Sequence, residues 1–122
     1  MTDNRTILIV DDSKVSRMMI KAIIKDLQPD WTMLEAGNAD EALEVNGQHC
    51  IDYFSVDLNM PGRDGLELIT ILKETNSKGV YALLTANIQE QIKKNASALG
   101  VNCINKPITE ESIGKMLGYF ND

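Results

Sequence analysis

The chain has 122 residues, 43% of them hydrophobic and 25% charged, which is the composition of a globular protein and excludes a disordered chain. Eighteen acidic residues against twelve basic ones give a net charge of −6, which repels nucleic-acid phosphates, so we predict no direct nucleic-acid binding. No apolar run approaches the length of a membrane span, and residues 1–5 do not resemble a secretory signal. We therefore predict a cytoplasmic protein without membrane insertion, in which residues 1–122 form one domain.

Short aliphatic runs alternate with longer amphipathic stretches along the chain, and the pattern repeats five times. Such alternation predicts an α/β fold, in which helices cover both faces of a parallel sheet. A helix is expected after each strand, and Gly47 and Gly100 are expected to end the second and fourth helices. The expected strands are residues 6–10, 31–36, 51–56, 80–84 and 101–104.

The first and last predicted helices have clear apolar stripes. Ser13 can cap the first helix, and Pro29 lies beyond its end. Spacings of three and four residues predict that its apolar face consists of Val15, Met18, Met19, Ala22, Ile23 and Leu27. The stripe of the last helix consists of Ile113, Met116, Leu117 and Phe120.

Polar residues follow four of the five predicted strands. Asp11 and Asp12 follow the first strand, Asp57 the third, Thr85 the fourth and Lys106 the fifth. Because the carboxyl ends of parallel strands share one edge of the sheet, we expect these side chains to form a single site. Three carboxylates at one edge repel each other unless a cation lies among them, and oxygen ligands suit Mg²⁺, with Mn²⁺ as an alternative.

Each of these residues also has an ordinary structural explanation. The Asp11-Asp12 pair could form a turn or cap a helix, and Asp57 could cap the turn that follows it. Thr85 could cap the next helix, and Lys106 could be a solvated charge. Their placement in order at successive strand ends favours a chemical site over these separate explanations.

The motifs resemble the receiver domains of two-component response regulators, and in length the chain is similar to the stand-alone chemotaxis-type members. The resemblance extends over nearly the whole chain and implies a doubly wound, flavodoxin-like sheet with strand order 2-1-3-4-5 and five helices. It rests on Asp11-Asp12, Asp57-x-x-Met60-Pro61-Gly62-x-Asp64-Gly65, Thr85-Ala86, Gly100-Val101 and Lys106-Pro107.

The resemblance implies that Asp57 is the phosphoacceptor. Asp12, Asp57 and the backbone carbonyl of Asn59 are implied as metal ligands, and Asp11 as the residue that orients metal-bound water. The implied partners are a histidine kinase or phosphotransfer protein as phosphoryl donor and a downstream effector protein. Catalysis is then limited to the protein's own phosphorylation and dephosphorylation, so the implied function is a signalling switch and not an enzyme.

The same resemblance implies how the switch is read. Lys106 is implied to pair with the phosphoryl group, and Thr85 to supply the switching hydroxyl. The peptide bond between Lys106 and Pro107 is implied to be cis. Asn59 and Asn87 are implied to border the path of the water that hydrolyses the phosphoryl group. The chain departs from the family at Cys103, because the family usually has tyrosine or phenylalanine three residues before the lysine.

Two other functions use part of the same residues. A metal-dependent phosphohydrolase can also use an aspartate nucleophile with Mg²⁺, but it needs an enclosed pocket and a nucleophile in a DxD arrangement after the first strand. Here the pair Asp11-Asp12 is adjacent and no insertion is long enough to form a lid. A degenerate receiver that binds its partner constitutively is the second alternative, and the intact Asp57, Thr85 and Lys106 argue against it.

Overall fold

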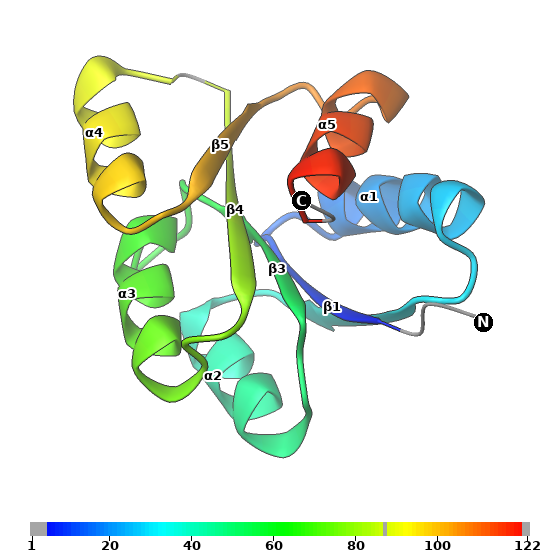
Figure 1. Ribbon diagram of the computed structural model, residues 1–122, viewed down its shortest axis with the longest axis horizontal. Helices are drawn as coiled ribbons and strands as arrows, with labels where there is room; N and C mark the ends of the chain where they lie inside the picture. The colour runs from blue at the N-terminus through cyan, green and yellow to red at the C-terminus, as the bar shows by residue number, and fades with distance from the viewer. Residues whose placement is uncertain (1–4, 87, 121–122) are drawn as a thin grey trace.

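The computed structural model describes residues 5–86 and 88–120, in which strands and helices alternate strictly (Figure 1). All strand pairs are parallel, and the order β2-β1-β3-β4-β5 confirms the predicted doubly wound, flavodoxin-like sheet. Within the described residues, no helix combines the length and the apolar character needed to cross a membrane. The strands are β1 (Thr6–Val10), β2 (Thr32–Ala36), β3 (Tyr53–Asp57), β4 (Val80–Thr85) and β5 (Asn102–Asn105).

Helices cover both faces of the sheet, as predicted (Figure 1). One face carries α1 (Lys14–Leu27) and α5 (Glu110–Phe120), and the other carries α2 (Ala39–Gln48), α3 (Gly65–Thr75) and α4 (Glu90–Ala98). Ser13 caps α1 as expected, because its side chain accepts a hydrogen bond from the backbone N–H of Ser16. Gly100 follows α4 with a φ of 73°, a conformation that glycine adopts without strain. Gly47 lies inside α2, so the prediction that it ends this helix is wrong.

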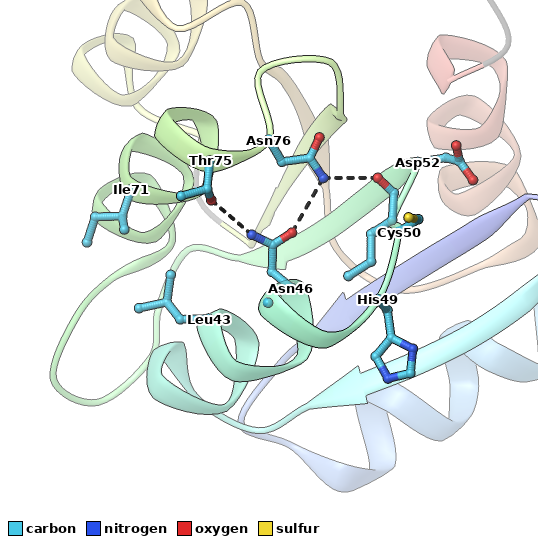
Figure 2. Close-up of a pocket in the computed structure, with 10 residues that line it drawn as sticks. Leu43, Asn46, His49, Cys50, Asp52, Ile71, Thr75 and Asn76 are labelled. Carbon is cyan, nitrogen blue, oxygen red and sulfur yellow. Dashed lines mark hydrogen bonds between the residues drawn. The ribbon is translucent and has the colours of Figure 1, made fainter.

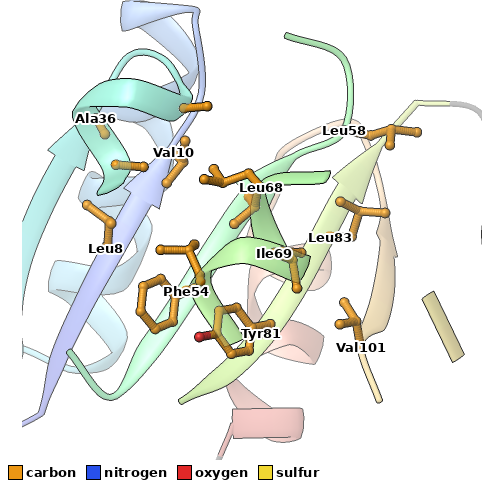
Figure 3. Packing of buried hydrophobic residues seen from close by; sticks show 14 of the residues in the cluster. Leu8, Val10, Ala36, Phe54, Leu58, Leu68, Ile69, Tyr81, Leu83 and Val101 are labelled. Carbon is orange, nitrogen blue, oxygen red and sulfur yellow. The ribbon is translucent and has the colours of Figure 1, made fainter. Parts of the chain in front are cut away.

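Aromatic stacks lie within both halves of the core. Phe54 and Tyr81 stack with ring centroids 4.5 Å apart beneath α2 and α3, and the residues packed around them include Leu68 and Ile69 of α3 (Figure 3). On the other face, Tyr53 stacks on Trp31 and Phe120 with centroids 4.8 and 4.7 Å away. The predicted stripe of α5 is confirmed, since its members are 0–4% exposed: Ile113, Met116, Leu117 and Phe120.

The buried face of α1 differs from the predicted one. Ile20 and Ile24, one helical turn apart, are 1% and 0% exposed and pack in the core beneath the helix. Successive residues are about 100° apart around a helix, so Val15 and Met18 point away from this face and are 66% and 59% exposed. The helix thus has two apolar stripes, and the sequence prediction took the outer one for the packed face. Of the six residues predicted, Ile23 alone packs against the core.

Gly65 lies where the backbone of α3 meets the end of β3. A Cβ atom at this position would lie 2.5 Å from the backbone oxygen of Asp57 and 2.9 Å from Cδ1 of Leu83. Both neighbours are held in the core, since Asp57 ends β3 and Leu83 is 0% exposed. Only glycine therefore allows α3 to start this close to the strand that carries Asp57.

We expect Gly65→Ala to lower the free energy of unfolding by about 1–3 kcal/mol, because the added methyl group overpacks a rigid contact. Gly118→Ala is the matched control, since Gly118 is an exposed helical glycine with open space around its Cα. Replacement of a helical glycine by alanine stabilises by about 1 kcal/mol. Urea denaturation of both variants measures the difference, and equal or increased stability of Gly65→Ala would contradict the close contact.

Candidate functional site

The loop between β1 and α1 carries the acidic pair at the carboxyl edge of the sheet. Asp11 is 1% exposed, and its backbone N–H donates to the carbonyl of Ala36 in the neighbouring strand at 3.1 Å. Its Oδ1 accepts a hydrogen bond from the backbone N–H of Ser13 at 2.9 Å, which turns the chain into α1. Asp12 is exposed at the next position, so the pair offers one buried carboxylate and one in solvent.

Asp57 lies at the end of β3 and is 5% exposed. Asp11, Asp12 and Asp57 each offer a carboxylate oxygen, and these oxygens all lie within 4.8 Å of one another. Nζ of Lys106 lies 3.2 Å from Oδ1 of Asp57 and 3.4 Å from Oδ2 of Asp11. The predicted convergence of these four side chains at one edge of the sheet is therefore confirmed.

Lys106 reaches the carboxylates from the loop after β5. Its backbone N–H donates to the carbonyl of Thr85 at 2.9 Å, which continues the pairing of β4 with β5 up to the site. The bond between Lys106 and Pro107 is cis, as the resemblance implied. Thr85 is 1% exposed at the end of β4, beside Asn105 in the register of the sheet.

The carboxylates carry more negative charge than Lys106 offsets. Burial raises the pKa of Asp57, the charge of Asp11 raises it further, and Lys106 acts in the opposite direction. Burial alone would lower the pKa of Lys106, but the charges of Asp57 and Asp11 outweigh it and the pKa is raised. The acidic triad is thus consistent with a divalent metal site, since hard oxygen ligands and uncompensated negative charge favour such a cation.

Other predicted residues lie around this cluster. Asn59 is exposed in the loop after β3, and Asn87 lies outside the described residues. Cys103 is partly buried on β5, and burial raises the pKa of its thiol, which keeps it protonated and unreactive at neutral pH. A separate hollow of about 640 Å³ lies at the opposite edge of the sheet, where Asn46 donates a hydrogen bond to Thr75 and accepts one from Asn76 (Figure 2).

The sequence prediction missed one residue that contacts the acidic loop. Arg17 is not among the predicted site residues, yet its Nη1 donates to the backbone carbonyl of Asp11 at 2.5 Å. Its Nε donates to Oε1 of Glu35 at 3.1 Å. The sequence signal for this contact was the position of Arg17, little more than one helical turn after the acidic pair, together with Glu35 near the end of the next strand.

A sequence model described as the response regulator receiver domain matches residues 7–118. The chain belongs to this family. Members are signalling switches and not true enzymes, and the acidic pocket of Asp11, Asp12 and Asp57 is typical of phosphoacceptor response regulators.

Relatives of this receiver domain occur both within long proteins and alone. It is 38% identical over 106 residues to sensor protein EvgS of Escherichia coli (strain K12), covering 85% of this chain and 9% of that protein. It is 30% identical over 112 residues to chemotaxis protein CheY of Halobacterium salinarum, covering 89% of this chain and 90% of that protein. The structure of chemotaxis protein CheY4 of Vibrio cholerae superposes with a TM-score of 0.84 at 25% identity, covering 93% of this chain and 96% of that chain.

The charges around Asp57 predict the order of its pKa values in metal-free variants. A carbon-13 NMR titration should place the pKa of Asp57 above that of an aspartate in an unfolded peptide. Asp11→Asn removes a like charge and should lower this pKa, whereas Lys106→Met removes the nearby cation and should raise it.

The same shift fixes the sign of the pH dependence. Because the folded-state pKa of Asp57 exceeds the unfolded one, its contribution to the free energy of unfolding falls as the pH rises through the interval between them. A folded-state pKa at or below the unfolded value would contradict the dominant effect of burial.

Proposed function

We propose that the receiver domain, formed by residues 1–122, accepts a phosphoryl group on Asp57 with the help of Mg²⁺ and thereby changes its binding to a downstream effector protein. The observation that supports this proposal best is the placement of Asp57 beside Asp11, Asp12 and Lys106 at one edge of the sheet. Mn²⁺ suits the same oxygen ligands. The setting we propose is the cytoplasm, with a histidine kinase or phosphotransfer protein as donor.

Charge balance explains why a cation and Lys106 are both needed. The three carboxylates carry −3, while one divalent cation and Lys106 carry +3, so the unmodified site is near neutral. Phosphorylation changes the charge at position 57 from −1 to about −2. Without both positive charges, this added charge would lie at a nearly buried position next to two carboxylates.

In the proposed reaction, a carboxylate oxygen of Asp57 forms a bond to phosphorus as the bond between phosphorus and the donor's histidine nitrogen breaks. The carboxylates of Asp12 and Asp57 and the backbone carbonyl of Asn59 would hold the metal, and Asp11 would orient its water. When bound, the cation withdraws charge from the phosphoryl oxygens. Lys106 is placed to donate hydrogen bonds to one of these oxygens, since its Nζ already lies 3.2 Å from Asp57.

The outward face of α1, formed by Val15, Met18 and Met19, favours a protein donor. These side chains are 66%, 59% and 45% exposed, and they begin three residues after Asp12. An exposed apolar patch of this kind is typical of protein–protein contacts. A donor helix that covers it would bring its phosphohistidine next to the acidic loop.

Thr85 is the proposed link from the phosphoryl group to the effector-binding surface. It is buried at the end of β4, and its hydroxyl can donate to a phosphoryl oxygen. From there the chain leads into α4. Cys103 on β5 is too small to act as an aromatic ring that moves inward, so we propose that coupling runs through Thr85 and the start of α4.

Phosphorylation of Asp57→Asn tests the proposed acceptor. Wild type should take up one phosphoryl group per chain from acetyl phosphate in the presence of Mg²⁺, and Asp57→Asn should take up none, because a neutral amide is not a nucleophile. Intact-protein mass spectrometry measures the uptake. Asp52→Asn is the control, since Asp52 precedes β3 at the opposite edge of the sheet and should leave uptake unchanged.

The same assay tests whether phosphoryl uptake requires a divalent metal. Uptake by wild type should cease in excess chelator, and Asp12→Ala should need far more Mg²⁺ than wild type. Uptake by Asp57→Asn at the level of wild type would contradict the acceptor assignment. Full uptake in chelator would contradict the metal requirement, and repeated hydrolysis of a phosphate ester would favour a phosphohydrolase instead.

A further inference from the structure

Arg17 makes two different bonds from one guanidinium group. Nη1 donates to the backbone carbonyl of Asp11 at 2.5 Å, and Nε donates to Oε1 of Glu35 on β2 at 3.1 Å. Glu35 also accepts a hydrogen bond from Lys21 at 2.9 Å through its other oxygen. The hydrogen bonds from Lys21 and Arg17 outweigh the opposing effect of burial and lower the pKa of Glu35. Arg17 itself is held by Oε1 of Glu35, the oxygen that Lys21 does not contact.

The carbonyl that Arg17 binds belongs to the peptide group between Asp11 and Asp12. A peptide group is planar, so fixing its oxygen also fixes the directions in which the chain leaves toward both residues. Within residues 5–86 and 88–120, the carboxylate of Asp12 forms neither a hydrogen bond nor an ion pair with another residue. The position of Asp12 therefore depends on its backbone, and Arg17 is the side chain that holds that backbone from α1.

We propose that Arg17 is a positioning residue that holds the acidic loop in the geometry needed to bind the divalent cation. Glu35 orients Arg17, so the contact joins β2 to the loop between β1 and α1. This inference rests on the proposed function, because it assigns a role in binding the same cation. Arg17 contacts neither the cation nor the phosphoryl group and acts through Asp11 and Asp12.

The chemistry of arginine suits this role in a way that lysine does not. A guanidinium group is planar and donates in several fixed directions, so one side chain can bind a carbonyl and a carboxylate at once. The backbone at Gly37 runs beside this group, since a Cβ atom there would lie 3.4 Å from Nη1 of Arg17. The arginine side chain is 17% exposed, so both bonds are partly shielded from water.

Mg²⁺ titration of metal-free protein by calorimetry tests this role. Arg17→Met should raise the dissociation constant for Mg²⁺ roughly tenfold, the lower end of the range for residues that orient metal ligands. Arg17→Lys should lie between wild type and Arg17→Met, because lysine can replace one of the two bonds. Lys21→Met is the matched control, since Lys21 shares Glu35 but does not contact the loop, and its dissociation constant should match wild type.

A second measurement separates positioning from general stability. The N–H of Ser13 donates to Oδ1 of Asp11, so its hydrogen exchange reports the loop directly. In metal-free protein, exchange at Ser13 should become faster in Arg17→Met and remain unchanged in Lys21→Met, when both are compared at equal free energy of unfolding.

The results distinguish failure of this inference from failure of the proposed function. If wild type binds no Mg²⁺, the proposed function fails. If wild type binds Mg²⁺ and Arg17→Met binds it equally well, the proposed function stands and the role of Arg17 is overturned. Equal losses of affinity in Arg17→Met and Lys21→Met would also overturn it, because they would reflect the charge near Glu35 and not the bond to the loop.

Discussion

Asp11 and Asp57 are two carboxylates, 1% and 5% exposed, that lie at the carboxyl ends of neighbouring strands, and Lys106 contacts both. Parallel pairing of β1 with β3 brings them together, so their mutual repulsion is built into the fold. Folding against this repulsion costs stability, which the protein can recover when a cation binds at the same edge. Burial and, after it, the charge of Asp11 raise the pKa of Asp57, so the carboxylate is less easily ionised here than in water.

The sequence predicted most of the fold because the strands here are unusually easy to recognise. Strands covered on both faces appear as continuous aliphatic runs, and a polar residue marks the end of each central one. The acidic pair, Asp57 and Lys106 could be placed together for the same reason, since parallel strands bring their carboxyl ends to one edge. Structural likeness to the chemotaxis proteins agrees with this at a TM-score of 0.84.

The errors have physical causes that the sequence pattern does not reveal. Helix α1 has apolar residues on two sides, and only the position of the sheet decides that Ile20 and Ile24 are buried while Val15 and Met18 are exposed. Gly47 is a weak helix former, but α2 continues past it to Gln48, and Asn46 in the same turn donates a hydrogen bond to Thr75 of α3. Arg17 could not be identified from periodicity, because its partner is a backbone carbonyl.

We propose that one carboxylate of this cluster, Asp57, carries the phosphoryl group, and that a metal and Lys106 compensate its charge. A crystal structure with Mg²⁺ and beryllofluoride, a stand-in for the phosphoryl group, tests this most directly. We expect beryllium bonded to a carboxylate oxygen of Asp57, the metal held by Asp12 and Asp57, and Nζ of Lys106 within hydrogen-bond distance of a fluoride. Beryllofluoride bound elsewhere, or a metal held without Asp12 and Asp57, would contradict these roles of Asp57 and Asp12.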